Sequence, residues 1–121
     1  MNPGLDPDAA RQVRVYTASG CEVVELLGEI DHANAPLVER DMLTTVRAAT
    51  GVVVDLTGTT FLDSAGLLCL DRVVTAFGNR GAPVRVAAPA AGMVRFTLDL
   101  VGFLPDLLAE DVDEALAAMT D

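Results

Sequence analysis

The pattern of apolar and polar positions predicts a strand followed directly by a helix in the middle of the chain. Residues 52–56 are apolar except for Asp55 and are rich in valine, which is typical of a short buried strand. The polar segment 57–60 ends this strand before apolar character returns at Phe61. Farther on, apolar side chains recur at the three- and four-residue spacing of an amphipathic helix, at Leu67, Leu70, Val74 and Phe77.

Asp63 and Ser64 lie at the predicted boundary between this strand and this helix. Both residue types favour the N-cap position, where a side-chain oxygen accepts a hydrogen bond from a free backbone N–H group. The first turn of a helix also carries partial positive charge, which suits a phosphate group. Ser64 is therefore either a structural cap or a hydroxyl presented for modification, and its position alone leaves both interpretations open.

Strands and helices alternate along the rest of the chain. A hairpin is predicted from residues 13–16 and 22–27, followed by a loop over residues 28–34 and by a helix that Asn34 caps and Gly51 ends. The later elements are a strand over 84–87, a helix that Pro89 opens and Gly102 ends, a short edge strand at 103–104, and a helix over 112–119 introduced by a capping box of Asp111 and Glu114. This order predicts an α/β protein with a small mixed β-sheet packed by about four α-helices.

The length of 121 residues fits one domain. Residues 1–11 are rich in proline, aspartate and glycine, so we expect a flexible N-terminal tail before a folded domain over residues 12–121. No apolar run approaches the roughly 18 residues that a membrane-spanning helix needs, and the first residues do not have the character of a leader peptide. A cytoplasmic location is the expectation.

The formal net charge is −10, from 18 acidic and 8 basic residues. This charge repels phosphate backbones and anionic lipid surfaces, so neither nucleic acid nor a membrane is an expected partner. A basic surface on another protein is compatible with it. The alternative that the charge only maintains solubility stays open.

Catalytic chemistry has little support in the sequence. Asp31, His32 and Ser64 are candidates for a hydrolase triad, but Ser64 lacks the glycine-flanked turn that exposes a nucleophilic serine. The separated aspartates follow no metal-binding pattern, and the chain contains no lysine for a phosphate-binding loop. Cys21 and Cys69 form no CxxC motif and are expected to be small buried residues. We therefore expect no enzymatic activity, no cofactor and no metal.

Two motifs at compatible spacing carry a resemblance to a known family. These are Leu27-Gly28-Glu29-Ile30-Asp31 and the segment Phe61-Leu62-Asp63-Ser64-Ala65-Gly66-Leu67, which follows Val52-Val53-Val54-Asp55-Leu56. Together they resemble the STAS family, most closely the bacterial anti-anti-sigma factors, which antagonise anti-sigma serine kinases. The resemblance covers about residues 13–119 and implies a single STAS-like domain with a small sheet packed on one side by helices.

The resemblance also implies roles for individual residues. Ser64 matches the serine that an anti-sigma factor with serine kinase activity phosphorylates, Asp63 matches the acidic residue beside it, and Asp31 matches an aspartate near that site. It implies that the unphosphorylated protein binds the anti-sigma factor and releases a sigma factor, and that a serine phosphatase resets the switch. Ala65 stands where a second serine is common, which leaves Thr59 and Thr60 as the nearby alternative hydroxyls.

Leu68 completes the expected partner-binding set of Asp31, Asp63, Ser64 and Leu68. It lies about 100 degrees around the predicted helix from Leu67, so it is expected to face outward near Ser64. An isolated exposed leucine is common, and position alone does not make it a binding residue. The alternative function is that of a STAS scaffold subunit in a larger signalling or transport complex without direct control of a sigma factor.

Overall fold

A computed structural model describes residues 12–47, 50–103 and 105–119, so the predicted tail over residues 1–11 lies outside the described residues. Its main sheet has the strand order β1-β2-β4-β6-β7. β1 and β2 form the predicted antiparallel hairpin, and the other neighbouring strands pair in parallel. The bounds are β1 (Val13–Ala18), β2 (Cys21–Leu26), β4 (Val52–Asp55), β6 (Val84–Ala87) and β7 (Leu108–Ala109). The mixed α/β sheet predicted from the sequence is confirmed.

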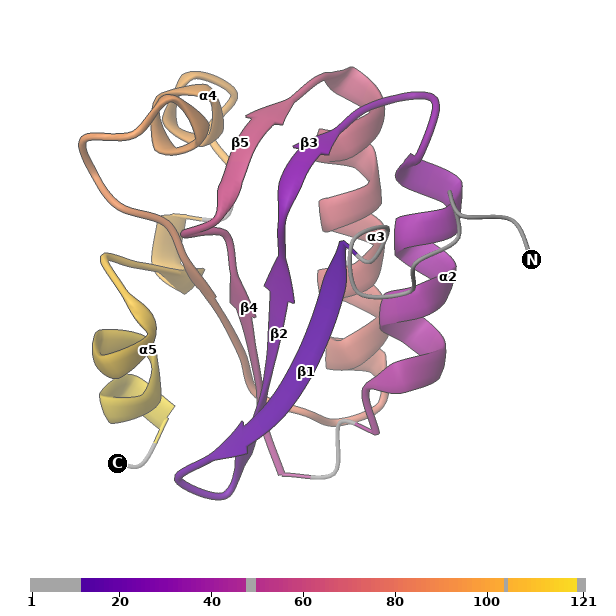
Figure 1. The fold of residues 1–121 in the computed structure, drawn as a ribbon. Helices are drawn as coiled ribbons and strands as arrows, with labels where there is room; N and C mark the ends of the chain where they lie inside the picture. Colours follow the sequence, from indigo (N-terminus) through magenta and orange to yellow (C-terminus); the bar gives the residue numbers. More distant parts are fainter. Residues whose placement is uncertain (1–11, 48–49, 104, 120–121) are drawn as a thin grey trace.

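A second, two-stranded sheet extends the middle of the first one. β3 (Gly28–Ile30) continues β2, and β5 (Thr59–Leu62) continues β4, and the two short strands pair in parallel (Figure 1). Gly28 has a φ of +78°, which allows the chain to turn directly after β2. The predicted loop over residues 28–34 therefore begins only after Ile30, and the predicted polar break over 57–60 is limited to the turn at residues 57–58, since Thr59 and Thr60 belong to β5. Each of these short strands contains exposed positions, so neither gives the run of apolar residues from which a buried strand is predicted.

Helices cover both faces of the main sheet. α2 (Ala35–Thr45) and α3 (Ser64–Asn79) pack together on one face, while α5 (Val112–Met119) packs on the opposite face (Figure 1). In β4, Val52 and Val54 therefore face α2 and α3, and Val53 faces α5. The expectation of helices on one side alone was wrong, because β4 is buried on both of its faces.

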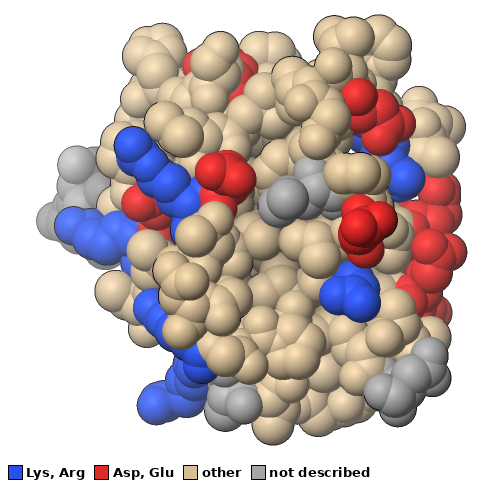
Figure 2. All heavy atoms as spheres, turned by 180° about the vertical axis from the view of Figure 1, so that it is seen from behind, with Lys and Arg blue, Asp and Glu red and all other residues tan. Residues whose placement is uncertain are grey.

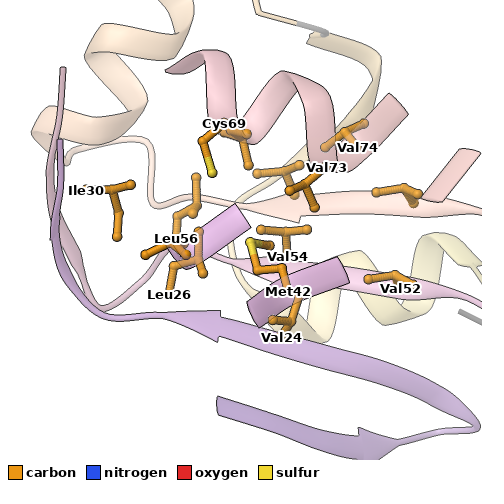
Figure 3. Close-up of a cluster of buried hydrophobic side chains, with 14 of the residues drawn as sticks. Val24, Leu26, Ile30, Met42, Val52, Val54, Leu56, Cys69, Val73 and Val74 are labelled. Carbon is orange, nitrogen blue, oxygen red and sulfur yellow. The ribbon is translucent and has the colours of Figure 1, made fainter. Parts of the chain in front are cut away.

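The main core lies between the sheet and the pair α2 and α3. Met42 of α2 and Val73 of α3 meet Val54 of β4 in this layer, and Cys69 is buried with them (Figure 3). Phe77 of α3 is fully buried in the same cluster. This layer holds α3 against the sheet and so fixes the position of its N-terminus.

The C-terminal third follows the predicted order with shifted boundaries. α4 (Met93–Leu100) begins after Gly92, not at Pro89, because residues 90–92 form a turn. The edge strand was predicted at residues 103–104, but Phe103 is not in a strand and Leu104 lies outside the described residues. The edge strand of the structure is β7, which follows the short 3-10 helix η2 (Pro105–Leu107). Of the predicted capping box, the first half is found, since the Glu114 N–H donates to Asp111 Oδ1 at 2.8 Å. The Glu114 carboxylate accepts the N–H of Glu110 at 3.2 Å instead of that of Asp111.

Substituting Phe77→Ala is expected to lower the free energy of unfolding by about 3–5 kcal/mol, because it leaves a cavity in the main core. Urea unfolding followed by circular dichroism measures this loss. Phe96→Ala is the matched control, since Phe96 is an exposed phenylalanine on α4. An equal loss for both variants would show that Phe77 is not a core residue.

Candidate functional site

The Asp63 carboxylate joins the two loops that meet at the N-terminus of α3. Its Oδ1 atom accepts a hydrogen bond from the Gly66 N–H at 2.9 Å, so of the two predicted cap candidates, Asp63 and Ser64, it is Asp63 that caps the helix. Its Oδ2 atom accepts the backbone N–H of His32 at 3.0 Å, and His32 lies in the loop between β3 and α2. The Asp63 N–H donates to the Ile30 carbonyl at 3.3 Å. One residue therefore caps α3 and fastens the neighbouring loop to it.

These contacts keep Asp63 ionised. The pKa of Asp63 lies below its ordinary value, chiefly because its carboxylate accepts the Gly66 N–H. Hydrogen bonds from the backbone and side chain of His32 and from the Ala65 backbone lower this pKa further, against a smaller opposite effect of burial. A negative charge therefore stands beside Ser64 at neutral pH.

Gly66 allows α3 to lie against the backbone of β3. A Cβ atom at this position would lie 2.4 Å from the Ile30 carbonyl oxygen and 3.1 Å from a methyl group of Leu62. Because the first contact is with backbone, the helix itself would have to move. The glycine therefore sets the distance between the N-terminus of α3 and the loop that carries His32.

Asp31 and Asn34 close the turn that precedes α2. The Asp31 Oδ1 atom accepts the N–H of Ala33 at 3.0 Å, and the Asn34 Oδ1 atom accepts the N–H of Asp31 at 2.9 Å. The Asn34 amide also donates to the Glu29 carbonyl and to Gln12 Oε1. Asn34 holds the N-cap position as predicted, but its side chain makes no capping hydrogen bond. The carboxylate of Asp31 shapes the loop that Asp63 holds beside Ser64.

Ser64 is the first residue of α3 and is exposed. Among the described residues its hydroxyl has no hydrogen-bonding partner, so it does not act as the helix cap. Of the two alternative hydroxyls, Thr59 is buried and donates to the Leu26 carbonyl at 2.6 Å, whereas Thr60 is exposed. The accessible hydroxyls in this segment are therefore those of Ser64 and Thr60.

A shallow hollow of about 240 Å³ lies between α2 and α3, next to Ser64. Leu68 lies one helical turn after Ser64 and lines this hollow. Its side chain is 48 % exposed, so it faces outward as predicted. Arg72 and Glu39 form an ion pair at 3.8 Å across the same hollow. Burial raises the pKa of the Cys69 thiol, at its base, to about 11, so this thiol stays protonated and unreactive.

Charge is unevenly distributed over the rest of the molecule. Figure 2 shows arginine side chains along the side of α2 and α3, and carboxylates along the edge where α5 lies.

Within the described residues, no group of three or more histidine, cysteine or acidic side chains is arranged to hold a metal ion. None of the helices described here combines the length and the apolar character needed to cross a bilayer.

The contact between His32 and Asp63 escaped the sequence analysis. The imidazole Nδ1 atom lies 3.6 Å from Asp63 Oδ2, and in the described part of the chain no hydrogen bond joins this ring to Ser64. The candidate triad of Asp31, His32 and Ser64 is thus not connected in this structure. No spacing rule relates residue 32 to residue 63, and only the parallel pairing of β3 with β5 brings them together.

Comparison with known proteins identifies the family. The sequence model of the STAS domain matches residues 12–115, nearly the whole chain. The chain therefore belongs to the STAS domain family, as its motifs predicted. A comparison with curated protein sequences gives no match.

Solved structures agree with this assignment. An anti-sigma factor antagonist from Mycobacterium paratuberculosis is 30% identical, with a TM-score of 0.72 over 90% of this chain and 93% of that one. The Bacillus cell fate determinant SpoIIAA in its phosphorylated form is 16% identical, with a TM-score of 0.63 over 90% and 99% of the two chains. The murine anion transporter Slc26a9 is 14% identical, with a TM-score of 0.72 over 93% of this chain and 19% of that one. The last two show a shared fold alone.

Substituting Gly66→Ala is expected to lower the free energy of unfolding by about 1–3 kcal/mol, because the added methyl group meets the Ile30 carbonyl. Gly78→Ala, near the end of the same helix, is the matched control, since an added Cβ there meets nothing within 4 Å. The control should be neutral or stabilising by up to about 1 kcal/mol, because alanine favours helices. Chemical unfolding compares the two, and an equally harmless Gly66 variant would contradict the close approach.

Substituting Asp63→Asn is expected to lower stability most at neutral pH, because the amide can accept only one of the two backbone hydrogen bonds. Since the pKa of Asp63 is lowered by folding, its carboxylate stabilises the fold above the ordinary pKa of about 3.9, and this contribution disappears as pH falls through the lowered value. The stability difference between wild type and variant should therefore shrink on acidification from pH 7 towards pH 2.

Urea unfolding at a series of pH values measures this difference. Asp71→Asn is the control on the same helix, because Asp71 is exposed and its carboxylate makes no hydrogen bond to any described residue. A stability difference for Asp63→Asn that stayed constant with pH would argue against an ionised cap.

Proposed function

We propose that this protein is an anti-sigma factor antagonist that phosphorylation of Ser64 switches off. In its unphosphorylated form it binds an anti-sigma factor with serine kinase activity, and the bound sigma factor is released. A serine phosphatase restores the active form. The observation that carries this proposal is the exposed, unbonded hydroxyl of Ser64 at the first position of α3. The 30% identity to an anti-sigma factor antagonist over nearly the whole chain supports it.

A phosphate group on Ser64 would change the charge of this surface strongly. It adds about −1.5 to −2 charges at pH 7. The neighbouring Asp63 already carries a negative charge, because its pKa is lowered by the hydrogen bonds it accepts. A partner docked here with an acidic or apolar surface would meet repulsion and a desolvation penalty. Loss of binding is the expected consequence.

The fold itself should tolerate the modification. Ser64 is exposed, and its hydroxyl has no hydrogen bond to lose among the described residues. The free N–H groups of the first helical turn favour an anion. Phosphorylation is therefore expected to alter the binding surface and leave the core in place.

The proposed partner surface surrounds Ser64 on two elements. Asp63 and the turn of Asp31 border it on one side, and Leu68 with its hollow borders it on the other. Leu68 supplies an apolar anchor that a partner side chain can cover. In this role the chain acts as a cytoplasmic binding module and a kinase substrate, without catalysis or a cofactor of its own.

A second candidate function is a STAS scaffold subunit in a larger assembly. It is favoured by the similarity to the fold of Slc26a9, in which the matched region makes up 19% of a much longer chain. A scaffold would remain in its assembly whatever the charge at residue 64. The two functions therefore predict different responses to the same substitution.

Substituting Ser64→Asp is expected to abolish binding of a kinase-like partner, whereas Ser64→Ala should retain it, because only the former adds a charge beside Asp63. Affinity capture from the native cytosol with both proteins as baits, followed by mass spectrometry, measures this. Thr75→Asp is the matched control, since Thr75 is exposed on the same helix, far from its N-terminus. All variants should give unchanged circular dichroism spectra.

The outcomes separate the candidate functions. A small ATP-binding kinase that follows the Ser64→Ala and Thr75→Asp baits, but leaves the Ser64→Asp bait, supports the antagonist. If all three baits capture the same large assembly, the antagonist function is wrong and the scaffold function takes its place.

A further inference from the structure

α4 carries apolar side chains on two different faces. Val94 and Leu98 are buried against the core, as the inner face of a surface helix should be. Met93, Phe96 and Leu100 lie on another face and are 71%, 60% and 74% exposed. A solvent-facing surface of this kind normally carries polar side chains, so this one is unusual.

The exposed apolar surface continues from α4 onto β5. Phe61 of β5 is 49% exposed, and together with Met93 and Thr97 it lines a small hollow of about 90 Å³ between the two elements. We refer to Phe61, Met93, Phe96 and Leu100 as the α4–β5 patch. The charged side chains of α4, Arg95 and Asp99, pair with each other at 3.3 Å, and these two positions lie on a different side of the helix.

The α4–β5 patch adjoins the site at Ser64. β5 ends at Leu62, two residues before Ser64, so Phe61 belongs to the segment that leads directly into the site. Figure 1 places α4 beside β5 at the same end of the molecule as the start of α3, and the upper surface in Figure 2 is mostly uncharged. A specific protein interface covers about 800 Å² on each partner, more than one helix end presents. A partner held at Ser64 therefore has to extend over neighbouring surface.

Charge argues against a second copy of this chain as the occupant. Each copy has a formal charge of −10, so pairing identical faces brings like charges together. A different protein whose apolar surface covers both Ser64 and the patch, and whose basic side chains lie only at the outer rim, matches the patch and the overall charge.

We propose that the kinase bound at Ser64 also covers the α4–β5 patch, and that the patch supplies apolar anchors for this complex. This proposal rests on the proposed function, because it extends the same interface. The patch would then determine how tightly the unphosphorylated protein is held, while Ser64 determines whether it is held at all.

The test uses the double variant Met93→Gln with Phe96→Gln, which removes apolar side chains that are exposed and keeps good helix formers at both positions. The probe is the purified kinase that the Ser64→Ala bait captures, and titration calorimetry gives its dissociation constant. The double variant should bind about 10-fold more weakly or worse. Tyr16→Gln is the matched control, because Tyr16 is an exposed aromatic on β1, and it should bind within about twofold of wild type.

The results distinguish the two proposals. Wild-type affinity of the double variant, together with loss of binding by Ser64→Asp, would overturn the role of the patch and leave the proposed function standing. If wild-type protein binds no kinase, both proposals fail. Sedimentation of the protein alone completes the test. If the wild-type protein is a dimer, the double variant is a monomer and the affinity for the kinase is unchanged, the patch binds a second copy of this chain and not the kinase.

Discussion

The double hydrogen bonding of the Asp63 carboxylate is the interaction on which the arrangement of the site depends. One oxygen caps α3 through Gly66, and the other holds the loop of His32. Together with the hydrogen bond from the Asp63 N–H to the Ile30 carbonyl, it ties the start of α3 to the loop that precedes α2. Because the same contacts lower the pKa of Asp63, the group that organises the surface also fixes its charge.

The hydrophobic core fixes the position of the surface around Ser64, although no core side chain needs to be exposed there. The layer between the main sheet and the pair α2 and α3 fixes both helices, and the short strands β3 and β5 carry the chain from that layer to the two loops. The accessible groups at the site, Ser64 and Leu68, lie on the side of α3 that the core does not use. This separation allows a surface to change its charge while the packing beneath it stays the same.

The sequence predicted the parts of this structure that depend on local pattern. The valine-rich run over residues 52–56, the spacing of apolar residues in α3 and the capping preference of aspartate each act over a few residues, and each was found as predicted. β3 and β5 were missed because each has three or four residues and depends on pairing with the other. The packing of α5 on the second face of β4 likewise depends on tertiary contacts that no local period encodes.

The sequence predicted which residues form the candidate site, but not the hydrogen bonds and close contacts between them. Leu68 is exposed, as helix geometry predicted, and of the two predicted cap candidates, Asp63 and Ser64, it is Asp63 that caps α3. The contact of His32 with Asp63 joins positions 31 residues apart, and it exists only because two parallel strands end side by side. Likewise, the need for glycine at position 66 becomes visible only when the Ile30 carbonyl is in place.

The close approach at Gly66 has a consequence for how a signal could pass through this molecule. With the Ile30 carbonyl directly against the helix backbone, α3 has no room to tilt towards β3. Under the proposed function, a phosphate at its N-terminus would act on a partner through its charge, without any movement of α3 towards β3. The state of the surface would then be set by the enzymes that add and remove that charge.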